Sequence, residues 1–260
     1  MSFDAAWLEL RAAADSAARD ARLRAAALAW LDGASAPGVV DLGCGTGALW
    51  RDFARPAARW RLIDNDPRLL GLAAGRCPGA ETVAADLADV AALPLGGARL
   101  VTASALLDLA SAAWLDALAE RLAAAGAAVY ACLSYDGTMN WSPGRSDDAA
   151  VVAAFNDHQR RDKGLGPALG PEAPADFAAA LARRGFAVRT APSPWRLGPG
   201  PLAATLAEGV AGAAAETGLA GTAAWLQARR TTRGCVVGHV DLLALPAASA
   251  QSKTTSESSP

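Results

Sequence analysis

The chain has 260 residues, a length that favours one α/β domain with a large core over two separate domains. Hydrophobic residues make up 52% of it, but alanine inflates this share. No run of about 18 strongly apolar residues free of charge and glycine occurs, so no membrane-spanning helix is predicted. The net charge is −2 and the cations are scattered, which disfavours a nucleic-acid substrate and favours a small molecule.

The N-terminus carries acids and lacks a basic segment followed by an apolar one, so we expect no secretory signal and a cytoplasmic protein. Its cysteines lie far apart, without a C-x-x-C pair or a histidine at metal-ligand spacing. They are Cys44, Cys77, Cys132 and Cys235. We therefore expect neither a disulfide framework nor a metal site.

The first predicted element is helical, because leucines recur among alanines and charges over residues 5–31 before a stop at Gly33. This pattern predicts a helical cap over residues 1–33. Short apolar runs then alternate with helical segments. Strands are predicted at 39–43, 60–64, 82–86, 100–103 and 127–133, after Gly185, and at 235–245. Helices are predicted from 48, at 67–76, 112–124, 174–185 and 201–230. The alternation predicts right-handed crossovers and a mostly parallel sheet.

A longer segment, residues 137–171, interrupts this alternation. The sequence SDD at 146–148 makes a good helix start and Gly164 a good stop, so the segment is predicted to be a lid insertion that contains a helix.

The last residues, 247–260, are small, polar and without a pattern. This composition predicts a disordered tail. One domain over residues 1–246 is therefore expected, with the helical cap and the lid insertion as parts of it.

The stretch VVDLGCGTG at 39–47 places an acid, Asp41, two residues before a glycine-rich turn between a strand and a helix. The glycines also satisfy the dinucleotide pattern G-x-G-x-x-G/A, which alone is a weak signal. A carboxylate beside the turn would repel a pyrophosphate and would attract a cationic ligand. S-adenosylmethionine, which carries a sulfonium and an ammonium group, fits this requirement.

This stretch resembles the first motif of the class I S-adenosylmethionine-dependent methyltransferases, and the order of elements extends the resemblance over residues 39–133. The resemblance implies a Rossmann-like fold with a seven-stranded, mostly parallel sheet and helices on both faces. It also implies that Asp64 accepts hydrogen bonds from the ribose hydroxyls and that Asp86 lies near the adenine amine. Each acid is also a helix-cap candidate, because it stands between a strand and a helix.

The predicted cofactor site combines these acids with the turn and with residues at the strand ends. Its members are Asp41, Gly43, Cys44, Gly45, Gly47, Asp64, Asn65, Asp86, Leu87 and Ser104. Cys44 is interpreted as a small packing residue, since no base or second cysteine stands nearby in the sequence. The loop at 102–111 is expected to face the methyl donor, because ligands bind beyond the carboxyl ends of parallel strands. It lacks the D/N-P-P-Y motif of enzymes that methylate nucleobase amines.

The catalytic candidates are His158, Tyr135 and Asp136. Tyr135 and Asp136 follow the fifth strand, and His158 shares one predicted helix face with Val151 and Phe155, which we expect to point to the substrate. The alternative for His158 is a hydrogen-bonded core position. A general base is needed only if the acceptor arrives protonated.

The cations Arg160, Arg161 and Lys163 have two interpretations: a solvated helix end, or an inward cluster that would imply an anionic acceptor. Trp141 and Trp195 are candidates for the walls of the substrate pocket and equally for packing, and we favour packing for Trp195.

We therefore predict methyl transfer from S-adenosylmethionine to a small-molecule acceptor. One rival is a nicotinamide-dependent reductase, but no Y-x-x-x-K pair occurs. The other is a protein that binds S-adenosylmethionine without catalysis, which no residue pattern contradicts.

Overall fold

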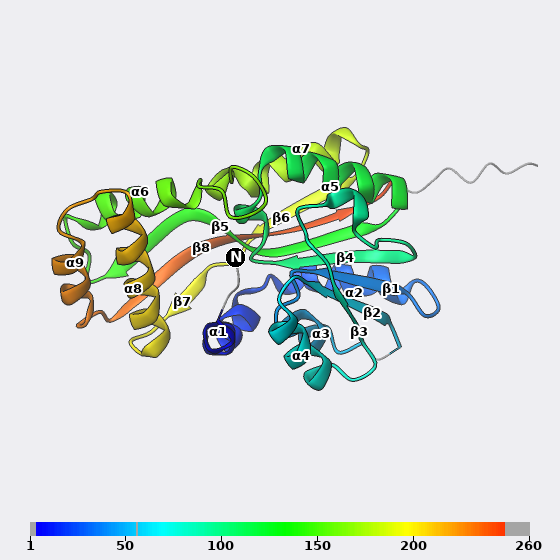
Figure 1. Ribbon diagram of the computed structural model, residues 1–260, viewed down its shortest axis with the longest axis horizontal. Helices are drawn as coiled ribbons and strands as arrows, with labels where there is room; N and C mark the ends of the chain where they lie inside the picture. The colour runs from blue at the N-terminus through cyan, green and yellow to red at the C-terminus, as the bar shows by residue number, and fades with distance from the viewer. Residues whose placement is uncertain (1–3, 56, 248–260) are drawn as a thin grey trace, which may run out of the picture.

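The computed structural model describes residues 4–55 and 57–247 (Figure 1). The predicted disordered tail, apart from residue 247, and the first three residues of the cap lie outside these ranges. The described residues form an eight-stranded sheet in the order β3-β2-β1-β4-β5-β8-β6, with β7 paired to β8. The strands are β1 Gly38–Leu42, β2 Arg59–Asp64, β3 Glu81–Ala84, β4 Ala98–Ser104, β5 Ala128–Ser142, β6 Ala187–Pro192, β7 Trp195–Leu197 and β8 Gly234–Leu245.

The first five strands in sheet order, β3, β2, β1, β4 and β5, are parallel to one another. The strand β8 runs antiparallel to β5, β6 and β7. The helices are α1 Ala5–Ala18, α2 Ala21–Asp32, α3 Ala48–Phe53, α4 Pro67–Arg76, α5 Ala112–Ala125, α6 Asp148–Gln159, α7 Ala173–Arg183, α8 Pro201–Glu216 and α9 Thr222–Arg229. Short 3-10 turns are η1 Val90–Ala92, η2 Leu107–Leu109 and η3 Gly170–Glu172. The mixed α/β architecture with a mostly parallel sheet confirms the predicted fold class, with β7 as a short additional strand.

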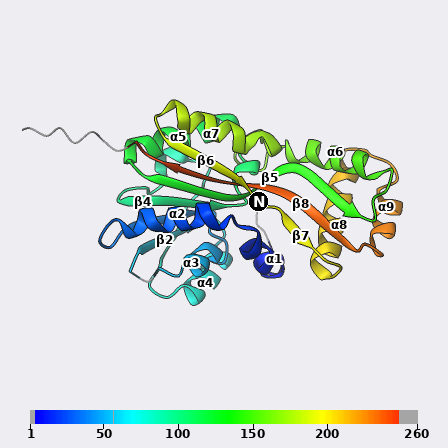
Figure 2. The same ribbon diagram turned by 180° about the vertical axis from the view of Figure 1, so that it is seen from behind.

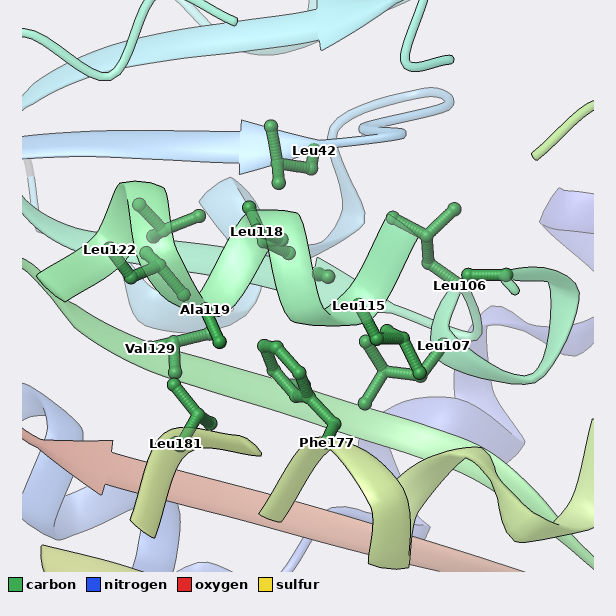
Figure 3. Packing of buried hydrophobic residues seen from close by; sticks show 14 of the residues in the cluster. Leu42, Leu106, Leu107, Leu115, Leu118, Ala119, Leu122, Val129, Phe177 and Leu181 are labelled. Atoms are coloured by element: carbon green, nitrogen blue, oxygen red, sulfur yellow. The ribbon is translucent and has the colours of Figure 1, made fainter. Parts of the chain in front are cut away.

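Helices cover both faces of the parallel part of the sheet. Figures 1 and 2 show α5 and α7 on one face and α2, α3 and α4 on the other. In Figure 3, Leu115, Leu118 and Leu122 of α5 lie near Val129 of β5 and Phe177 of α7. Their leucine spacing gives α5 an apolar stripe that the sheet and α7 bury together.

A third cluster of buried side chains lies beyond this core, in a region that we call the distal arm (residues 135–159 and 195–237). The arm contains the C-terminal part of β5, the N-terminal part of β8, β7, α6, α8 and α9. Figure 1 shows these helices around the far ends of the two long strands. Trp141, Trp195 and Trp225 are part of its buried core.

Three predicted segments differ from the structure. Helical residues 5–31 form α1 and α2, because Asp20 interrupts the pattern and caps α2 by accepting the backbone N–H groups of Arg22 and Leu23. The helical stretch at 201–230 likewise divides into α8 and α9. The strand expected to end at residue 133 continues to Ser142, so the start of the predicted lid insertion is strand instead.

The continuation of β5 passes through an irregular region near Leu133, which has a φ of 58°. The pairing of β5 with β8 shifts register across this residue, between Ala131 and Ser134, and again between Tyr135 and Met139. Asp241 of β8 compensates for the lost ladder bond, since its Oδ1 accepts the Leu133 N–H at 2.9 Å. Such bulges bend a strand, and this one separates the parallel half of the sheet from the distal arm.

Candidate functional site

The glycine turn between β1 and α3 has a backbone that requires glycine. Gly43, Gly45 and Gly47 all have positive φ. A Cβ on Gly45 would lie 3.0 Å from Leu8 Cδ1, and one on Gly47 would collide with the Cys77 sulfur. The turn is therefore compressed between α1 and α4, and Gly47 serves helix packing instead of lining the pocket.

Asp64, at the end of β2, is the acid most closely tied to this turn. Its Oδ2 accepts the Gly45 N–H at 2.9 Å, and its Oδ1 accepts the Asp66 N–H at 3.0 Å. The cap of α4 is Asp66, whose carboxylate accepts the Arg68 N–H, so the helix-cap alternative for Asp64 is wrong. Each Asp64 oxygen keeps a second lone pair, and the residue lines the pocket.

Asp86 is more loosely held. The strand β3 ends at Ala84, so Asp86 follows it by two residues and is exposed. Its Oδ1 accepts the Ala88 N–H at 2.9 Å in a local turn. The cap of the following turn η1 is Asp89, so the helix-cap alternative for Asp86 is wrong as well. Asp86 and Leu87 both line the pocket.

Asp41 lies behind the pocket wall. Alternate residues of a strand share a face, so Asp41 points with Val39 to the side of α2, and it does not line the pocket. Its Oδ1 accepts the hydroxyl hydrogen of Thr102, its cross-strand partner, at 2.7 Å. Burial raises the pKa of Asp41 to about 7, against the opposing effects of Thr102 and Arg19.

The pocket lies at the carboxyl ends of β1, β2 and β4, where the parallel sheet is expected to bind its ligand. Its walls come from the glycine turn, the β2 and β3 ends, the β4 end with η2, the cap and the segment after α6. The lining residues are Leu8, Arg11, Asp15, Gly43, Cys44, Gly45, Thr46, Ala48, Asp64, Asn65, Leu69, Asp86, Leu87, Ser104, Ala105, Leu106, Leu109, Lys163, Gly164 and Leu165. Of the predicted cofactor residues, the structure brings all together here except Asp41 and Gly47.

Cys44 lines the pocket and is buried. Burial, followed by the charges of Asp41 and Asp64, raises the pKa of its thiol. The thiol therefore stays protonated near neutral pH, which agrees with the packing interpretation.

The cap contributes wall residues that sequence reasoning missed. Leu8, Arg11 and Asp15 lie on one face of α1, a spacing visible in the sequence. Arg11 Nε lies 2.8 Å from Asp15 Oδ2, and the Arg11 guanidinium stands 5.3 Å from the centre of the Trp195 ring. The sequence pattern shows that these residues share a face, but it does not show that α1 packs over the glycine turn.

The segment after α6, which we call the strap (residues 163–169), closes another side. Its Leu165 carbonyl accepts the Ser111 N–H at 3.1 Å, and the Leu169 N–H donates to the Ala110 carbonyl at 2.9 Å. Burial lowers the pKa of Lys163, the cation of the strap. The predicted lid thus contributes the strap to the pocket, while its helix α6 packs on α8 and β5.

The structure does not bring His158 to the pocket lining. Its Nε2 lies 3.0 Å from Glu216 Oε2 of α8, and its Nδ1 lies 3.3 Å from Lys163 Nζ. The face of α6 that we expected to point to a substrate therefore contacts α8 through His158 and β5 through Phe155, whose ring centre lies 5.6 Å from that of Tyr135. A catalytic role for His158 stays a prediction that the pocket lining does not support.

Tyr135 and Asp136 also lie outside the lining, because β5 continues past them. The Tyr135 hydroxyl donates to Asn156 Oδ1 at 2.9 Å, and burial raises the pKa of this hydroxyl. Asp136 Oδ1 accepts the Thr138 N–H at 2.9 Å. Their catalytic roles likewise stay predictions.

Two of the three cations near the end of α6 form surface ion pairs. Arg160 pairs with Glu172 at 2.6 Å and Arg161 with Glu216 at 3.2 Å, whereas Lys163 lines the pocket. The solvated interpretation therefore fits Arg160 and Arg161.

Neither tryptophan proposed as a pocket wall lines the pocket. Trp141 and Trp195 are buried in the distal arm, so packing describes both.

No helix among the described residues is long and apolar enough to cross a membrane. Over the same residues, no group of three or more histidine, cysteine or acidic side chains is arranged to hold a metal ion.

Residues 39–127 match the family model described as methyltransferase domain. The matched residues run from β1 to the position before β5, so they include the glycine turn, Asp64 and Asp86. The match confirms the resemblance to the class I S-adenosylmethionine-dependent methyltransferases. It also supports two further predictions, a methyltransferase activity and S-adenosylmethionine as the cofactor.

No curated protein matches the chain in sequence. Among solved structures, it is similar to human N-acetylserotonin methyltransferase in complex with SAM, at 15% identity and a TM-score of 0.45, over 92% of this chain and 52% of that one. It is also similar to magnesium protoporphyrin IX methyltransferase of Synechocystis PCC 6803 with bound SAH, at 18% identity and a TM-score of 0.47. That match covers 86% of this chain and 82% of the other. A third similar structure is an O-methyltransferase family protein of Burkholderia thailandensis, at 19% identity and a TM-score of 0.49. That match covers 72% of this chain and 54% of the other. The chain spans about half the length of the human protein.

Proposed function

We propose that the chain transfers a methyl group from S-adenosylmethionine to a small-molecule acceptor. The observation that carries this proposal is the position of Asp64, which holds the glycine turn through the Gly45 N–H and still faces the pocket. The residues of the pocket fit the cofactor. The glycine turn forms a cradle that a Cβ on Gly45 would narrow, and the carboxylates of Asp64 and Asp86 can accept hydrogen bonds from hydroxyl and amine groups.

Within this proposal, Asp64 accepts hydrogen bonds from the ribose, while Asp86, Asn65 and Leu87 hold the adenine. Gly43, Cys44, Gly45 and Ser104 surround the methionine part. The carboxylates that line the pocket, with Asp41 behind them, favour a cationic ligand over a pyrophosphate.

The bound cofactor supplies an electrophilic methyl group on a sulfonium, which is a good leaving group. The chain contributes position: alignment of the acceptor with the methyl group accounts for much of the rate increase in such a displacement. The α1 cap and the strap form two walls of the pocket and so reduce the contact of the reacting groups with water.

The acceptor is proposed to be small, because α1 and the strap border the pocket on both sides of the cofactor residues. Of the three cations considered at the end of α6, Lys163 alone supports an anionic group on the acceptor.

Calorimetric titration of the purified protein with S-adenosylhomocysteine, with NADH in parallel, tests the proposal. Micromolar or tighter binding of the first and no binding of the second is expected. The reverse result would favour the reductase rival. Binding of S-adenosylhomocysteine by a protein that methylates no acceptor in a broad small-molecule screen would favour the non-catalytic rival.

A further inference from the structure

Several buried polar atoms without a hydrogen-bond partner belong to β5, to β8 and to the segments beside these two strands. Among the described residues, they include Asp108 Oδ1, Ser134 Oγ, Ser193 Oγ and His239 Nδ1. Buried polar groups are nearly always paired, so a group of unpaired ones indicates a position where a ligand or water completes them. None of these residues was singled out by the sequence patterns.

Asp108 is the charged member of this group. It belongs to η2, between the pocket residues Leu106 and Leu109, and is only 8% exposed. Asp108 lies behind the lining and is not itself a lining residue. Burial raises the pKa of Asp108 to about 6, while the backbone N–H groups of Asp108 and Tyr135 and the charges of Arg11 and Lys163 oppose the rise. The carboxyl group is therefore mostly ionised at neutral pH, with Oδ1 unpaired.

The backbone beside Asp108 is strained. Ala105, at the end of β4, has a φ of 52°, a value that residues other than glycine adopt rarely. Leu133, in the irregular region of β5, has a φ of 58°. Such backbone persists where the surrounding structure holds it, often at functional sites. The backbone N–H of Tyr135, two residues after Leu133, is among the groups that oppose the rise in the pKa of Asp108.

Arg11 connects this group to the pocket. Its side chain lines the pocket, and its charge acts on both Asp108 and His239. Burial, followed by the charge of Arg11, lowers the pKa of His239 to about 4, so His239 is neutral near pH 7. The Trp195 and Tyr135 rings stand 5.1 and 6.3 Å from the His239 ring centre.

We propose that Asp108 binds the acceptor, and that the acceptor is a small molecule with an apolar ring that carries a hydroxyl group. The ring lies among Leu106, Leu109 and Leu165, and the hydroxyl donates its hydrogen to Asp108 Oδ1. This inference rests on the proposed function and names the class of acceptor. Asp108 Oδ1 is closed to solvent. The proposal therefore includes an opening step, in which the strap lifts from its backbone bonds to Ala110 and Ser111, beside η2, to admit the acceptor.

The chemistry balances without a further reactant. As the acceptor oxygen forms its bond to the methyl carbon, the carbon–sulfur bond breaks and its electron pair stays on sulfur. The O–H bond also breaks, and its proton passes to Asp108, which releases it to solvent when the product leaves. A carboxylate that is ionised and dry is suited to this task.

Binding of phenol and of anisole, measured by NMR titration of the protein loaded with S-adenosylhomocysteine, tests the proposal without turnover. Anisole has the same ring and no donor. We expect phenol to bind about tenfold more tightly, the value of one hydrogen bond to a charged acceptor. In Asp108→Asn, the amide oxygen can keep the Tyr135 N–H and the NH2 group replaces Oδ1 by a donor, so the preference for phenol should disappear.

Asp116→Asn is the matched control, because Asp116 is half-exposed and pairs with Arg184 away from the pocket. It should keep the preference for phenol. Equal binding of phenol and anisole by the unaltered protein, binding of neither, or a preference that persists in Asp108→Asn would overturn the assignment. Failure of the unaltered protein to bind S-adenosylhomocysteine would instead contradict the proposed function, and loss of that binding in Asp108→Asn alone would give Asp108 a role in the fold or the cofactor site.

Discussion

The parallel half of the sheet and the distal arm use polar residues in different ways. At the strand ends of the parallel half, Asp64 and Asp86 bond to backbone groups and still line a pocket. In the arm, polar groups bond to one another: Asp148 accepts hydrogen bonds from Trp225 and Arg229, and His158 pairs with Glu216. The comparison indicates that ligand binding belongs to the first region and that the second contributes mainly packing.

The largest effect is expected from Trp225→Ala in the arm. Trp225 is fully buried, its ring centre lies 5.4 Å from that of Trp141, and its Nε1–H donates to Asp148 at 2.8 Å. Truncation should lower the free energy of unfolding by about 3–5 kcal/mol, as for other buried aromatic residues. Denaturant titration measures this change.

Trp225→Phe retains most of the ring and should lose less stability. The affinity of the folded Trp225→Ala protein for S-adenosylhomocysteine should not change. A weaker affinity, measured under conditions in which the variant is fully folded, would show that the arm and the pocket are coupled. It would contradict the assignment of ligand binding to the parallel half alone.

Asp64→Ala in the parallel half should weaken binding of S-adenosylhomocysteine by about tenfold to a hundredfold, because it removes a charged hydrogen-bond acceptor. From the sequence alone we would expect an intact fold. The structure adds a loss of stability, since the N–H groups of Gly45 and Asp66 lose their partner. Calorimetry and thermal unfolding separate the two effects.

Asp32→Ala serves as the control, because Asp32 is an exposed acid paired with Arg55. Pairs of this kind contribute little. Unchanged affinity in Asp64→Ala would remove Asp64 from the ribose site.

The ionisation of Asp41 should change the affinity for S-adenosylmethionine with pH, and this change should be smaller than the effect of Asp64→Ala. With its pKa raised by burial to about 7, Asp41 is mostly neutral at pH 6 and mostly negative at pH 8. A negative charge behind the turn favours the sulfonium of S-adenosylmethionine, which S-adenosylhomocysteine lacks. The preference for the former should therefore grow from pH 6 to pH 8, by about tenfold at most.

Calorimetric titrations of both ligands at the two pH values measure this preference. Asp41→Asn keeps an acceptor for the Thr102 hydroxyl and should show no such change. A preference that falls as the pH rises would contradict the role of Asp41.

Much of the parallel half follows from local sequence. Asp64 ends β2 and Asp86 follows β3 by two residues, so the order of strands together with the family resemblance predicted that both acids line the pocket. Asp41 was misplaced because its strand parity turns the side chain behind the wall.

The remaining site residues depend on tertiary contacts. Arg11 and Lys163 reach the pocket from α1 and from the strap, and no local pattern shows which surface those segments cover. The continuation of β5 was missed for a related reason. Asp136 and Gly137 resemble a turn in sequence, and they lie in a second irregularity of β5, between Tyr135 and Met139. Pairing with β8 resumes at Met139 and carries the strand on to Ser142.

The smallest effect is expected from His158→Gln. His158 pairs with the exposed Glu216, so the free energy of unfolding should change by less than about 1 kcal/mol. The affinity for S-adenosylhomocysteine should stay the same. A loss of methyl-transfer rate at unchanged affinity would restore the catalytic role expected from the sequence and would extend the functional region into the arm.

The continuity of β5 and β8 limits how the domain can be dissected. Both strands cross from the parallel half into the arm, so the halves share backbone ladders in place of a linker. A fragment of residues 39–127 would leave β4 as an unprotected edge without β5, and such edges promote aggregation. The matched methyltransferase segment is therefore expected to be insoluble when it is excised, and any transplant of this pocket into another protein must carry the two-strand ribbon with it.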